Sequence, residues 1–283
     1  MSYQVQPSTL RFLWADTPAA EADIIIVGFP FDGTTSYRAG TRFGPNALRE
    51  GSWTLEVYSP HLDRSLTGMK IADVGDLPLP PTGSERVTQM IYEYCSTQVK
   101  AGKKLAGIGG EHSVSYGLIK ACFDKYPDLH VVHFDAHADL REDWMGERWS
   151  HASIIKRVLD FLPPNRLTQY GIRSGTQDEF TWMRANNTLV ENRDELIHRM
   201  KNANAPIFIT FDLDFYDPAY FPGTGTPEPG GGSPHEIFSI FNEIKNDINL
   251  VGFDALELAP QFDSSNVSGV LAAKTLRELL LLF

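Results

Sequence analysis

The run DAHAD at residues 135–139 carries three metal-binding residue types at alternating positions: Asp135, His137 and Asp139. In an extended segment, residues two apart point to the same side, so these three side chains can face one point. Ionisable groups that converge beyond a buried strand repel one another or stay desolvated unless a cation joins them. We therefore favour a metal site over the alternative of a charged turn facing water.

Two further runs supply ligands of the same kind: His112 in GGEHS, and Asp212 and Asp214 in DLD. Each is weak alone, since a lone histidine is often a capping or core residue and surface turns often contain D-x-D. Together the three runs offer four carboxylates and two imidazoles without a thiolate, a set that suits Mn²⁺-type ions better than zinc. Six ligands exceed the need of one ion with an open position, whereas two ions about 3.5–4 Å apart can share bridging carboxylates.

Two more residues are candidates for chemistry without binding metal. His151 follows the metal-binding run, although a histidine at this place can equally be a helix N-terminal residue of no consequence. Glu257 lies inside the apolar run ALEL at residues 255–258, where a buried carboxylate needs a partner.

Short apolar or β-branched runs alternate with segments of helical periodicity, which predicts a mostly parallel sheet covered by helices on both faces. The predicted strands are 23–27, 70–74, 104–108, 129–134, 167–172, 206–211 and 250–258. The predicted helices are 84–101, 114–125, 153–162, 177–186, 194–201, 234–246 and 267–282. The candidate residues lie at or just beyond the carboxyl ends of predicted strands, where ligands bind in open α/β sheets.

No composition shift, linker or internal repeat divides the chain, so we expect one domain over residues 1–283. Two loops rich in glycine and proline, 28–45 and 217–234, are long enough to suggest a functional role.

Composition excludes several classes of protein. The 283 residues include 25 Lys plus Arg and 36 Asp plus Glu, a formal net charge of −11, which argues against nucleic-acid binding and mildly favours a cationic small ligand. Apolar runs are too short to span a bilayer and the first residues do not resemble a secretion signal, so we expect a cytoplasmic protein without membrane contact. Two cysteines are too few for a disulfide framework.

Six ordered segments resemble the signatures of the ureohydrolases, the arginase and agmatinase family. They are GFPFDGTTSYRAGTRFGPNALRE, GGEHS, FDAHADLR, SHAS, FDLDFYDPAYFPGTGTPEPGG and GFDALELAP. The resemblance implies a three-layer α/β/α fold and two Mn²⁺ ions per chain that serve the hydrolysis of a guanidino compound to an amine and urea. It assigns His112, Asp135, Asp139 and Asp212 to one ion, and Asp135, His137, Asp212 and Asp214 to the other.

The resemblance also implies roles around the metals. Asp139 would orient the attacking water, Glu257 would pair with the substrate's guanidinium, and His151 would relay a proton to the departing amine, a task suited to its ordinary pKa near ~6.5.

Agmatine, hydrolysed to putrescine and urea, is the substrate that this resemblance favours. Ser174 and Thr176 stand where arginases carry aspartates for the α-ammonium group, and acidic residues at 142, 143 and 147 or Glu228 would attract a distal ammonium. N1-aminopropylagmatine and 4-guanidinobutyrate remain open, because residues 151–153 read His-Ala-Ser where agmatinases commonly read His-Gly-Thr.

Two alternative hypotheses lie outside the ureohydrolases. One is a non-catalytic relative that binds metal or a guanidine, and the other is a one-metal zinc deacetylase of related fold. The family resemblance further implies a homo-oligomer, a trimer or hexamer.

Overall fold

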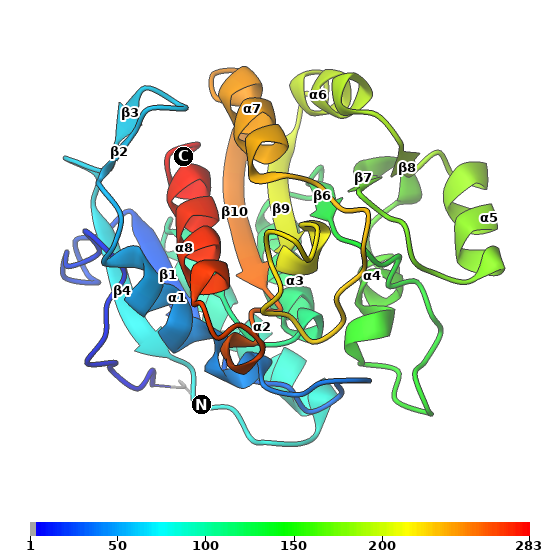
Figure 1. The fold of residues 1–283 in the computed structure, drawn as a ribbon, viewed down its shortest axis with the longest axis horizontal. Coiled ribbons are helices and arrows are strands. Elements are labelled where there is room, and N and C mark those ends of the chain that lie inside the picture. Colours follow the sequence, from blue (N-terminus) through cyan, green and yellow to red (C-terminus); the bar gives the residue numbers. More distant parts are fainter. Residues whose placement is uncertain (1–3) are drawn as a thin grey trace.

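The computed structural model describes residues 4–283, so the first three residues of the predicted domain 1–283 lie outside it. An eight-stranded sheet crosses the molecule in the order β4-β1-β5-β10-β9-β6-β7-β8, and every neighbouring pair in it is parallel (Figure 1). Its strands are β1 (Ile24–Gly28), β4 (Ile71–Asp76), β5 (Lys104–Ile108), β6 (His130–Phe134), β7 (Leu167–Tyr170), β8 (Leu189–Val190), β9 (Pro206–Asp212) and β10 (Asn249–Leu256). A separate antiparallel pair joins β2 (Tyr58–Ser59) to β3 (Arg64–Ser65).

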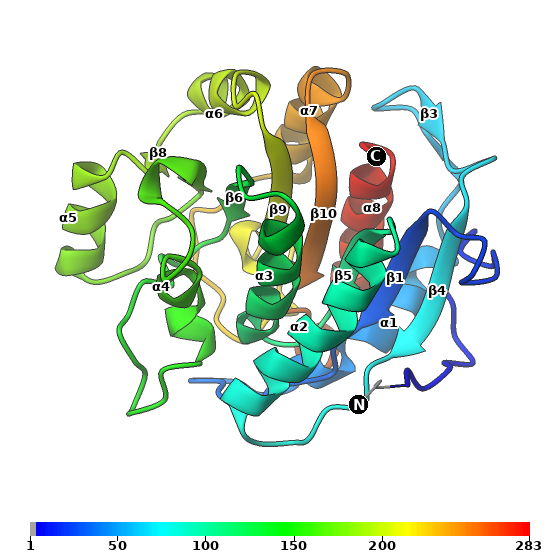
Figure 2. The same ribbon diagram turned by 180° about the vertical axis from the view of Figure 1, so that it is seen from behind.

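Helices cover both faces of the sheet. Figure 1 shows one layer, made of α1 (Gly44–Ser52), α6 (Arg193–Lys201), α7 (Pro234–Ile244) and α8 (Val267–Leu280). Figure 2 shows the other face, covered by α2 (Ser84–Lys100), α3 (Ser115–Lys125) and α4 (Ile154–Val158), with α5 (Gln177–Ala185) beyond β8. The predicted three-layer α/β/α fold with a mostly parallel sheet is confirmed.

The alternation of side chains along each strand creates two cores. In β1, Ile24 and Ile26 join one buried cluster, while Ile25 and Val27 join the cluster on the opposite face. Because both faces are buried, the central strands are apolar almost throughout, as is typical of parallel sheets. Each such side chain contributes about 1.5–3 kcal/mol by burial.

The elements differ from the sequence prediction mainly near glycine and proline. Helix α1 begins at Gly44, inside the stretch predicted as loop 28–45, with Pro45 in its first turn. Proline suits this position because it has no N–H group, and the N–H groups in the first turn of a helix have no acceptor within the helix. The predicted helix 153–162 is shorter, since α4 ends at Val158 and turns follow it.

A tight turn after β5 carries the chain into the candidate site. Gly109 and Gly110 have φ values of +70° and +81°, and a Cβ on Gly110 would lie 2.2 Å from the carbonyl oxygen of Phe29. Only glycine fits such a left-handed turn at so close a backbone approach. Within residues 4–283, no helix has the length and apolar character needed to cross a membrane.

Candidate metal centre

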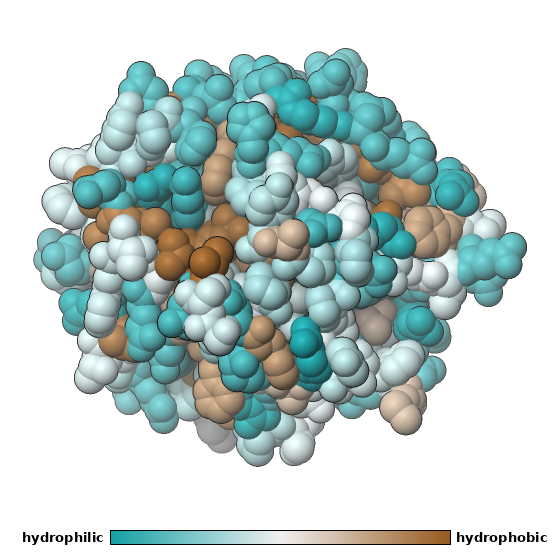
Figure 3. Space-filling model, viewed as in Figure 1, coloured by the Kyte–Doolittle hydropathy of each residue, from teal (hydrophilic) through white to brown (hydrophobic). Residues whose placement is uncertain are grey.

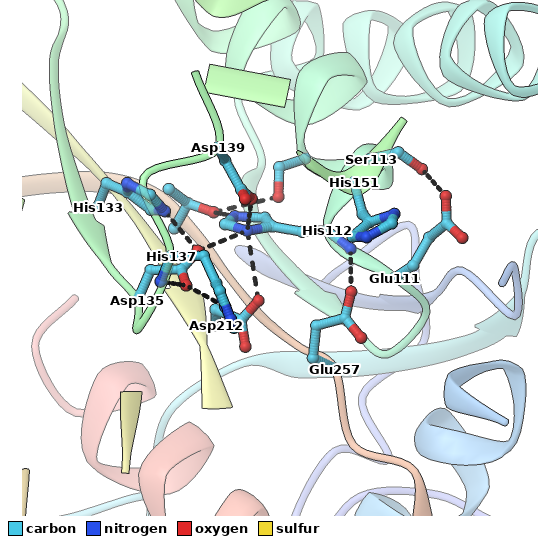
Figure 4. Close-up of polar contacts among 12 residues, drawn as sticks. Glu111, His112, Ser113, His133, Asp135, His137, Asp139, His151, Asp212 and Glu257 are labelled. Atoms are coloured by element: carbon cyan, nitrogen blue, oxygen red, sulfur yellow. Dashed lines mark hydrogen bonds and ion pairs between the residues drawn. The ribbon is translucent and has the colours of Figure 1, made fainter. Parts of the chain in front are cut away.

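The candidate ligands meet at the carboxyl edge of the sheet (Figure 4). His112 opens a short 3-10 helix after β5, the run 135–139 follows β6, and Asp212 and Asp214 lie at the end of β9. The order β5-β10-β9-β6 puts these strand ends side by side. Parallel strands therefore bring together residues that are up to about a hundred positions apart in the sequence.

His112 is the centre of the first group of ligands. Its Nδ1 lies 3.0 Å from Asp135 Oδ2, 3.0 Å from Asp139 Oδ2 and 3.4 Å from Asp212 Oδ2. This buried nitrogen nevertheless has no well-formed hydrogen bond within residues 4–283, whereas Nε2 is 2.9 Å from Thr210 Oγ1. An imidazole that is fixed through one nitrogen and aims the other at three carboxylates has the arrangement of a metal ligand.

His137 belongs to the second group. Its Nδ1 lies 3.0 Å from Asp214 Oδ2 and 3.4 Å from Asp135 Oδ1. Asp135 thus directs one oxygen to each histidine group, as expected of a carboxylate shared by two ions. All six residues predicted as metal ligands are brought together in this region.

His133 was not among the predicted site residues. It lies two positions before Asp135, so the two side chains point to the same side of the extended segment. The Nε2 of His133 is 2.7 Å from Asp135 Oδ2. Nδ1 in turn lies 3.2 Å from the amide nitrogen of Gln169. Such a contact behind a ligand holds a carboxylate in position, and the H-x-D alternation at 133–135 is the signal that could have revealed it.

The carboxylates are buried and close to one another, which perturbs their ionisation. Burial, together with the charges of Asp214 and Asp135, raises the pKa of Asp212 well above its usual range. Burial and the neighbouring Asp135 also raise the pKa of Asp139. This crowding of acidic groups fits a site that binds cations, and the oxygen-rich donor set fits hard or borderline divalent ions.

Glu257 follows β10 and is only 4% exposed. Its φ of +66° is rare for a residue with a side chain, and its Oε1 accepts a 2.7 Å hydrogen bond from the backbone N–H of His112. Burial and the charges of Glu111 and Asp214 raise its pKa well above the ordinary value. The partner that the sequence required for this carboxylate is thus the backbone of a predicted metal ligand.

His151 begins another 3-10 helix and is held at both ring nitrogens. Nδ1 lies 3.1 Å from Thr34 Oγ1, and Nε2 lies 3.2 Å from Ser36 Oγ. Burial, followed by the nearby imidazoles of His137 and His112, lowers the pKa of His151 to about 4. This differs from the ordinary value on which the sequence-based interpretation relied, because the ring is withdrawn from solvent.

These groups open onto a common cavity of about 200 Å³. Its walls include the residues His112, His137, Asp139, His151, Asp212, Glu257, Ser36, Arg141, Trp144, Ser174, Glu179 and Thr226. The cavity joins the metal-ligand groups to a mouth formed by the loops after β6 and β7.

The sequence predicted that acidic residues in segment 142–147 attract the distal ammonium group of the substrate, and the mouth of the cavity differs from this prediction. Segment 142–147 contributes Trp144 to the wall, while Glu142 is exposed and pairs with Arg157 and Arg148 at 3.0 Å each. Its carboxylate is therefore already engaged by arginines.

Ser174 does line the cavity, as the substrate interpretation requires. Thr176 instead caps α5, where its hydroxyl accepts a hydrogen bond from the Glu179 N–H and its own N–H donates to Glu179 Oε2. Residue 176 is thus committed to starting a helix, a role visible in the T-x-x-E spacing.

Comparisons with known proteins agree with this arrangement. A model of the arginase family matches residues 22–282. The agmatinase of Bacillus subtilis is 43% identical over 269 residues, which cover 93% of this chain and 92% of that protein. A solved protein of Clostridium difficile shares 42% identity with a TM-score of 0.90 and coverage of 94% and 98% of the two chains. The agmatine ureohydrolase of Thermoplasma volcanium shares 30% identity with a TM-score of 0.87, covering 97% and 94%.

Proposed function

Because this chain belongs to the arginase family, we propose that it is a metal-dependent ureohydrolase that converts agmatine and water to putrescine and urea. The observation that supports this most directly is the pair of His/Asp groups that share Asp135 beside the cavity bordered by Glu257. A non-catalytic relative would not need the ligand groups, a guanidinium partner and the partly buried His151 in one cavity.

We assign two Mn²⁺ ions to this centre. One would be held by His112, Asp135, Asp139 and Asp212, and the other by Asp135, His137, Asp212 and Asp214. When bound, the ions would lower the pKa of a water molecule far enough for it to attack at neutral pH. The orphaned Nδ1 of His112 and the shared position of Asp135 support two ions over the single zinc of a deacetylase.

The chain's own residues would position the substrate and the protons. Glu257 would pair with the planar guanidinium, which stays charged because its pKa lies far above neutral pH. Asp139 would accept a hydrogen bond from the attacking water. His151 would take a proton at a ring nitrogen and give it to the departing amine.

Agmatine is favoured over arginine by what the cavity wall offers. Ser174 is neutral and cannot compensate the α-ammonium of arginine, whose desolvation costs of order 1–3 kcal/mol. We therefore expect kcat/KM for agmatine to exceed that for arginine by roughly tenfold to a hundredfold.

A second candidate, 4-guanidinobutyrate, is favoured by one observation. The guanidinium of Arg141 lines the mouth, stacks on Trp144 at 5.1 Å from the ring centre, and has no ion-pair partner among the residues that the structure describes. A terminal carboxylate would complement this cation better than an ammonium does.

The test is urea release from agmatine, arginine, N1-aminopropylagmatine and 4-guanidinobutyrate with Mn²⁺ present. We expect agmatine to give the highest kcat/KM. Preference for 4-guanidinobutyrate would reassign the substrate, and failure of every compound to yield urea would reject the proposed reaction. Elemental analysis of the active form should find about two manganese ions per chain, and one zinc ion would contradict the centre proposed here.

We also propose a cytoplasmic homo-oligomer, a trimer or hexamer, in which residues 1–283 form one domain. Figure 3 shows apolar residues gathered on the face of the molecule that carries α8. Val267, at the start of α8, is 53% exposed. An exposed apolar area of this kind is typical of a protein interface. Light scattering should therefore give a mass several times that of one chain.

A further inference from the structure

The loop after β1 connects His151 to a buried carboxylate that the proposed mechanism does not use. Glu111 is fully buried, and its Oε2 accepts a 2.7 Å hydrogen bond from the Thr34 N–H. Its Oε1 accepts hydrogen bonds from Thr34 Oγ1 at 2.5 Å and from Ser113 Oγ at 2.6 Å. Figure 4 shows Glu111 and His151 on the same side of the site, opposite His133.

Thr34 lies between this carboxylate and the imidazole. Its Oγ1 is 3.1 Å from the backbone nitrogen of His151 and 3.1 Å from Nδ1 of the same residue. A hydroxyl donates one hydrogen bond and accepts two. In its ionised form Glu111 can only accept hydrogen bonds, so in that form the proton of Thr34 points to Glu111, and both lone pairs of the Thr34 oxygen are left for donors on His151.

This count determines which ring nitrogen carries the proton. The backbone N–H of His151 uses one lone pair of Thr34 Oγ1, so Nδ1 must supply a proton to use the other. In the neutral ring, Nε2 is then unprotonated and available as a base. Nε2 is 3.2 Å from Ser36 Oγ, and both residues line the cavity.

We propose that Glu111 and Thr34 are positioning residues that hold His151 as the Nδ1–H tautomer and thereby present Nε2 to the substrate. This inference rests on the proposed function only for its kinetic consequence. In the reaction, Nε2 accepts one proton from the attacking water and passes it to the nitrogen of the departing amine, which returns His151 to the same neutral tautomer. The Nδ1–H bond through Thr34 to the carboxylate stabilises the imidazolium that forms between these two transfers.

The tautomer can be observed without turnover. In ring-¹⁵N-labelled full-length protein with chelator added, a long-range ¹H–¹⁵N spectrum near pH 8 distinguishes protonated from unprotonated ring nitrogens. The signals of His151 are assigned by their loss in His151→Gln. We expect a protonated Nδ1 and an unprotonated Nε2 in the parent protein, and the reverse pattern there would overturn the proposal.

Three substitutions test the relay. Thr34→Val keeps the shape and removes the hydroxyl, so it should lower kcat at least about tenfold with KM changed less than twofold. Thr34→Ser should restore both kcat and the tautomer. In Glu111→Gln the amide NH₂ donates to Thr34 Oγ1, which turns the Thr34 proton toward Nδ1, so this variant should show the Nε2–H tautomer.

Thr35→Val is the matched control. It removes a hydroxyl from the same loop whose recorded contact is the carbonyl oxygen of Asp32, 3.3 Å away. It should retain the parent kcat and tautomer. A merely structural role for Thr34 would instead appear in Thr34→Val as a lower thermal midpoint or metal content with the parent tautomer, and that result rejects the proposal.

The tautomer test is independent of the proposed function. If no guanidino compound releases urea, the proposed reaction is rejected, but the spectra of the parent, Thr34→Val and Glu111→Gln still decide which ring nitrogen of His151 carries the proton. If Glu111→Gln does not fold, the comparison of Thr34→Val with Thr34→Ser still decides the outcome.

Discussion

Asp139 and Glu257 both adopt left-handed backbone conformations, with φ values of +52° and +66°. Residues with side chains avoid this region, and holding one there costs of order 1–3 kcal/mol. Each is buried at the end of a strand or in the loop beyond it and faces the same cavity. Because the surrounding packing maintains two such conformations at one site, we infer that the directions of these carboxylates matter for function.

Glu257→Gln should separate substrate binding from metal binding. Glutamine retains an oxygen for the His112 N–H but loses the charge that would face the guanidinium. Because hydrogen bonds to charged groups contribute about 1.5–3 kcal/mol, kcat/KM for agmatine should fall roughly ten- to hundredfold. Metal content, measured by elemental analysis, should remain that of the parent protein. Loss of metal in this variant would show that Glu257 supports the ligands more than the substrate.

The strand ends explain which site residues could be predicted from sequence. Ligands two apart, such as Asp212 and Asp214, reveal themselves because an extended segment turns alternate side chains to one side. Thr34 escaped prediction because its contact with Glu111 joins residues 77 positions apart, and nothing local in a Gly/Thr-rich loop distinguishes this hydroxyl from that of Thr35. Long-range contacts of loops are set by packing and not by periodicity.

Helix α1 is tied to β4 by a buried ion pair. Arg49 is fully buried and bonds to Asp73 through Nε at 2.8 Å and through Nη2 at 2.9 Å, and to Asp76 through Nη1 at 2.7 Å. Arg49→Met leaves Asp73 buried without its counter-charge, so it should lower the free energy of unfolding by about 3–5 kcal/mol.

The measurement is urea-induced unfolding of metal-free protein. Arg193→Met serves as the control, since Arg193 pairs with Glu243 at the partly exposed surface and its loss should cost less than about 1 kcal/mol. Equal effects of the two substitutions would contradict the argument from burial.

Strand β6 begins at a histidine that makes stability depend on pH. Burial, followed by the charges of Arg166 and Arg199, lowers the pKa of His130 to about 4. In the unfolded chain His130 has the ordinary histidine pKa of about 6.5, so the unfolded state binds the proton first as the pH falls. The free energy of unfolding therefore decreases progressively between about pH 6.5 and pH 4. From the two pKa values, the loss at pH 5 is about 2 kcal/mol.

His130→Gln should remove this dependence while retaining a partner for Thr168 Oγ1, which lies 2.9 Å from the histidine Nε2. Between pH 7.5 and pH 5, metal-free His130→Gln should lose about 2 kcal/mol less unfolding free energy than the parent protein. His198→Gln, which alters an exposed histidine on α6, should behave as the parent does. Identical pH profiles for His130→Gln and the parent would disprove the assignment.

At the scale of elements, apolar periodicity predicted the longer strands and helices, but it did not reveal some short elements. The sequence located β5 at 104–108, as observed, because a buried parallel strand is a continuous apolar run bounded by glycine and charge. It missed α1 and the two-residue strand β8, Leu189–Val190. Strand β8 is too short to show a period, and α1 begins with glycine and proline, which resemble loop residues until the helix that packs on it is known.

At the scale of the whole molecule, negative charge is concentrated at one edge of the sheet. Four candidate metal-binding carboxylates and Glu257 lie together in a chain whose formal net charge is −11. Burial, followed by neighbouring carboxylates, raises the pKa values of Asp139, Asp212 and Glu257, so ionisation of these groups in the metal-free site is unfavourable. Cations bind only the folded arrangement, because the ligands come from three separate strand ends. Mn²⁺ should therefore raise the thermal midpoint, by an amount that grows with its concentration.

Asp212→Asn should change the thermal midpoint in opposite directions with and without metal. Asparagine is similar in shape and uncharged, so it relieves repulsion in the metal-free protein but weakens a ligand that both ions would share. With chelator, the thermal midpoint of Asp212→Asn should be higher than that of the parent protein, since asparagine avoids the cost of burying an ionisable carboxyl group beside Asp214 and Asp135. With excess Mn²⁺ the order should reverse, because the parent gains binding energy that the variant lacks. Glu257→Gln is the matched control, since it also removes a buried charge but should keep the parent's response to Mn²⁺. If calorimetry found the same Mn²⁺-dependent shift in Asp212→Asn and in the parent, Asp212 would not be a metal ligand and the acidic edge of the sheet would need another explanation.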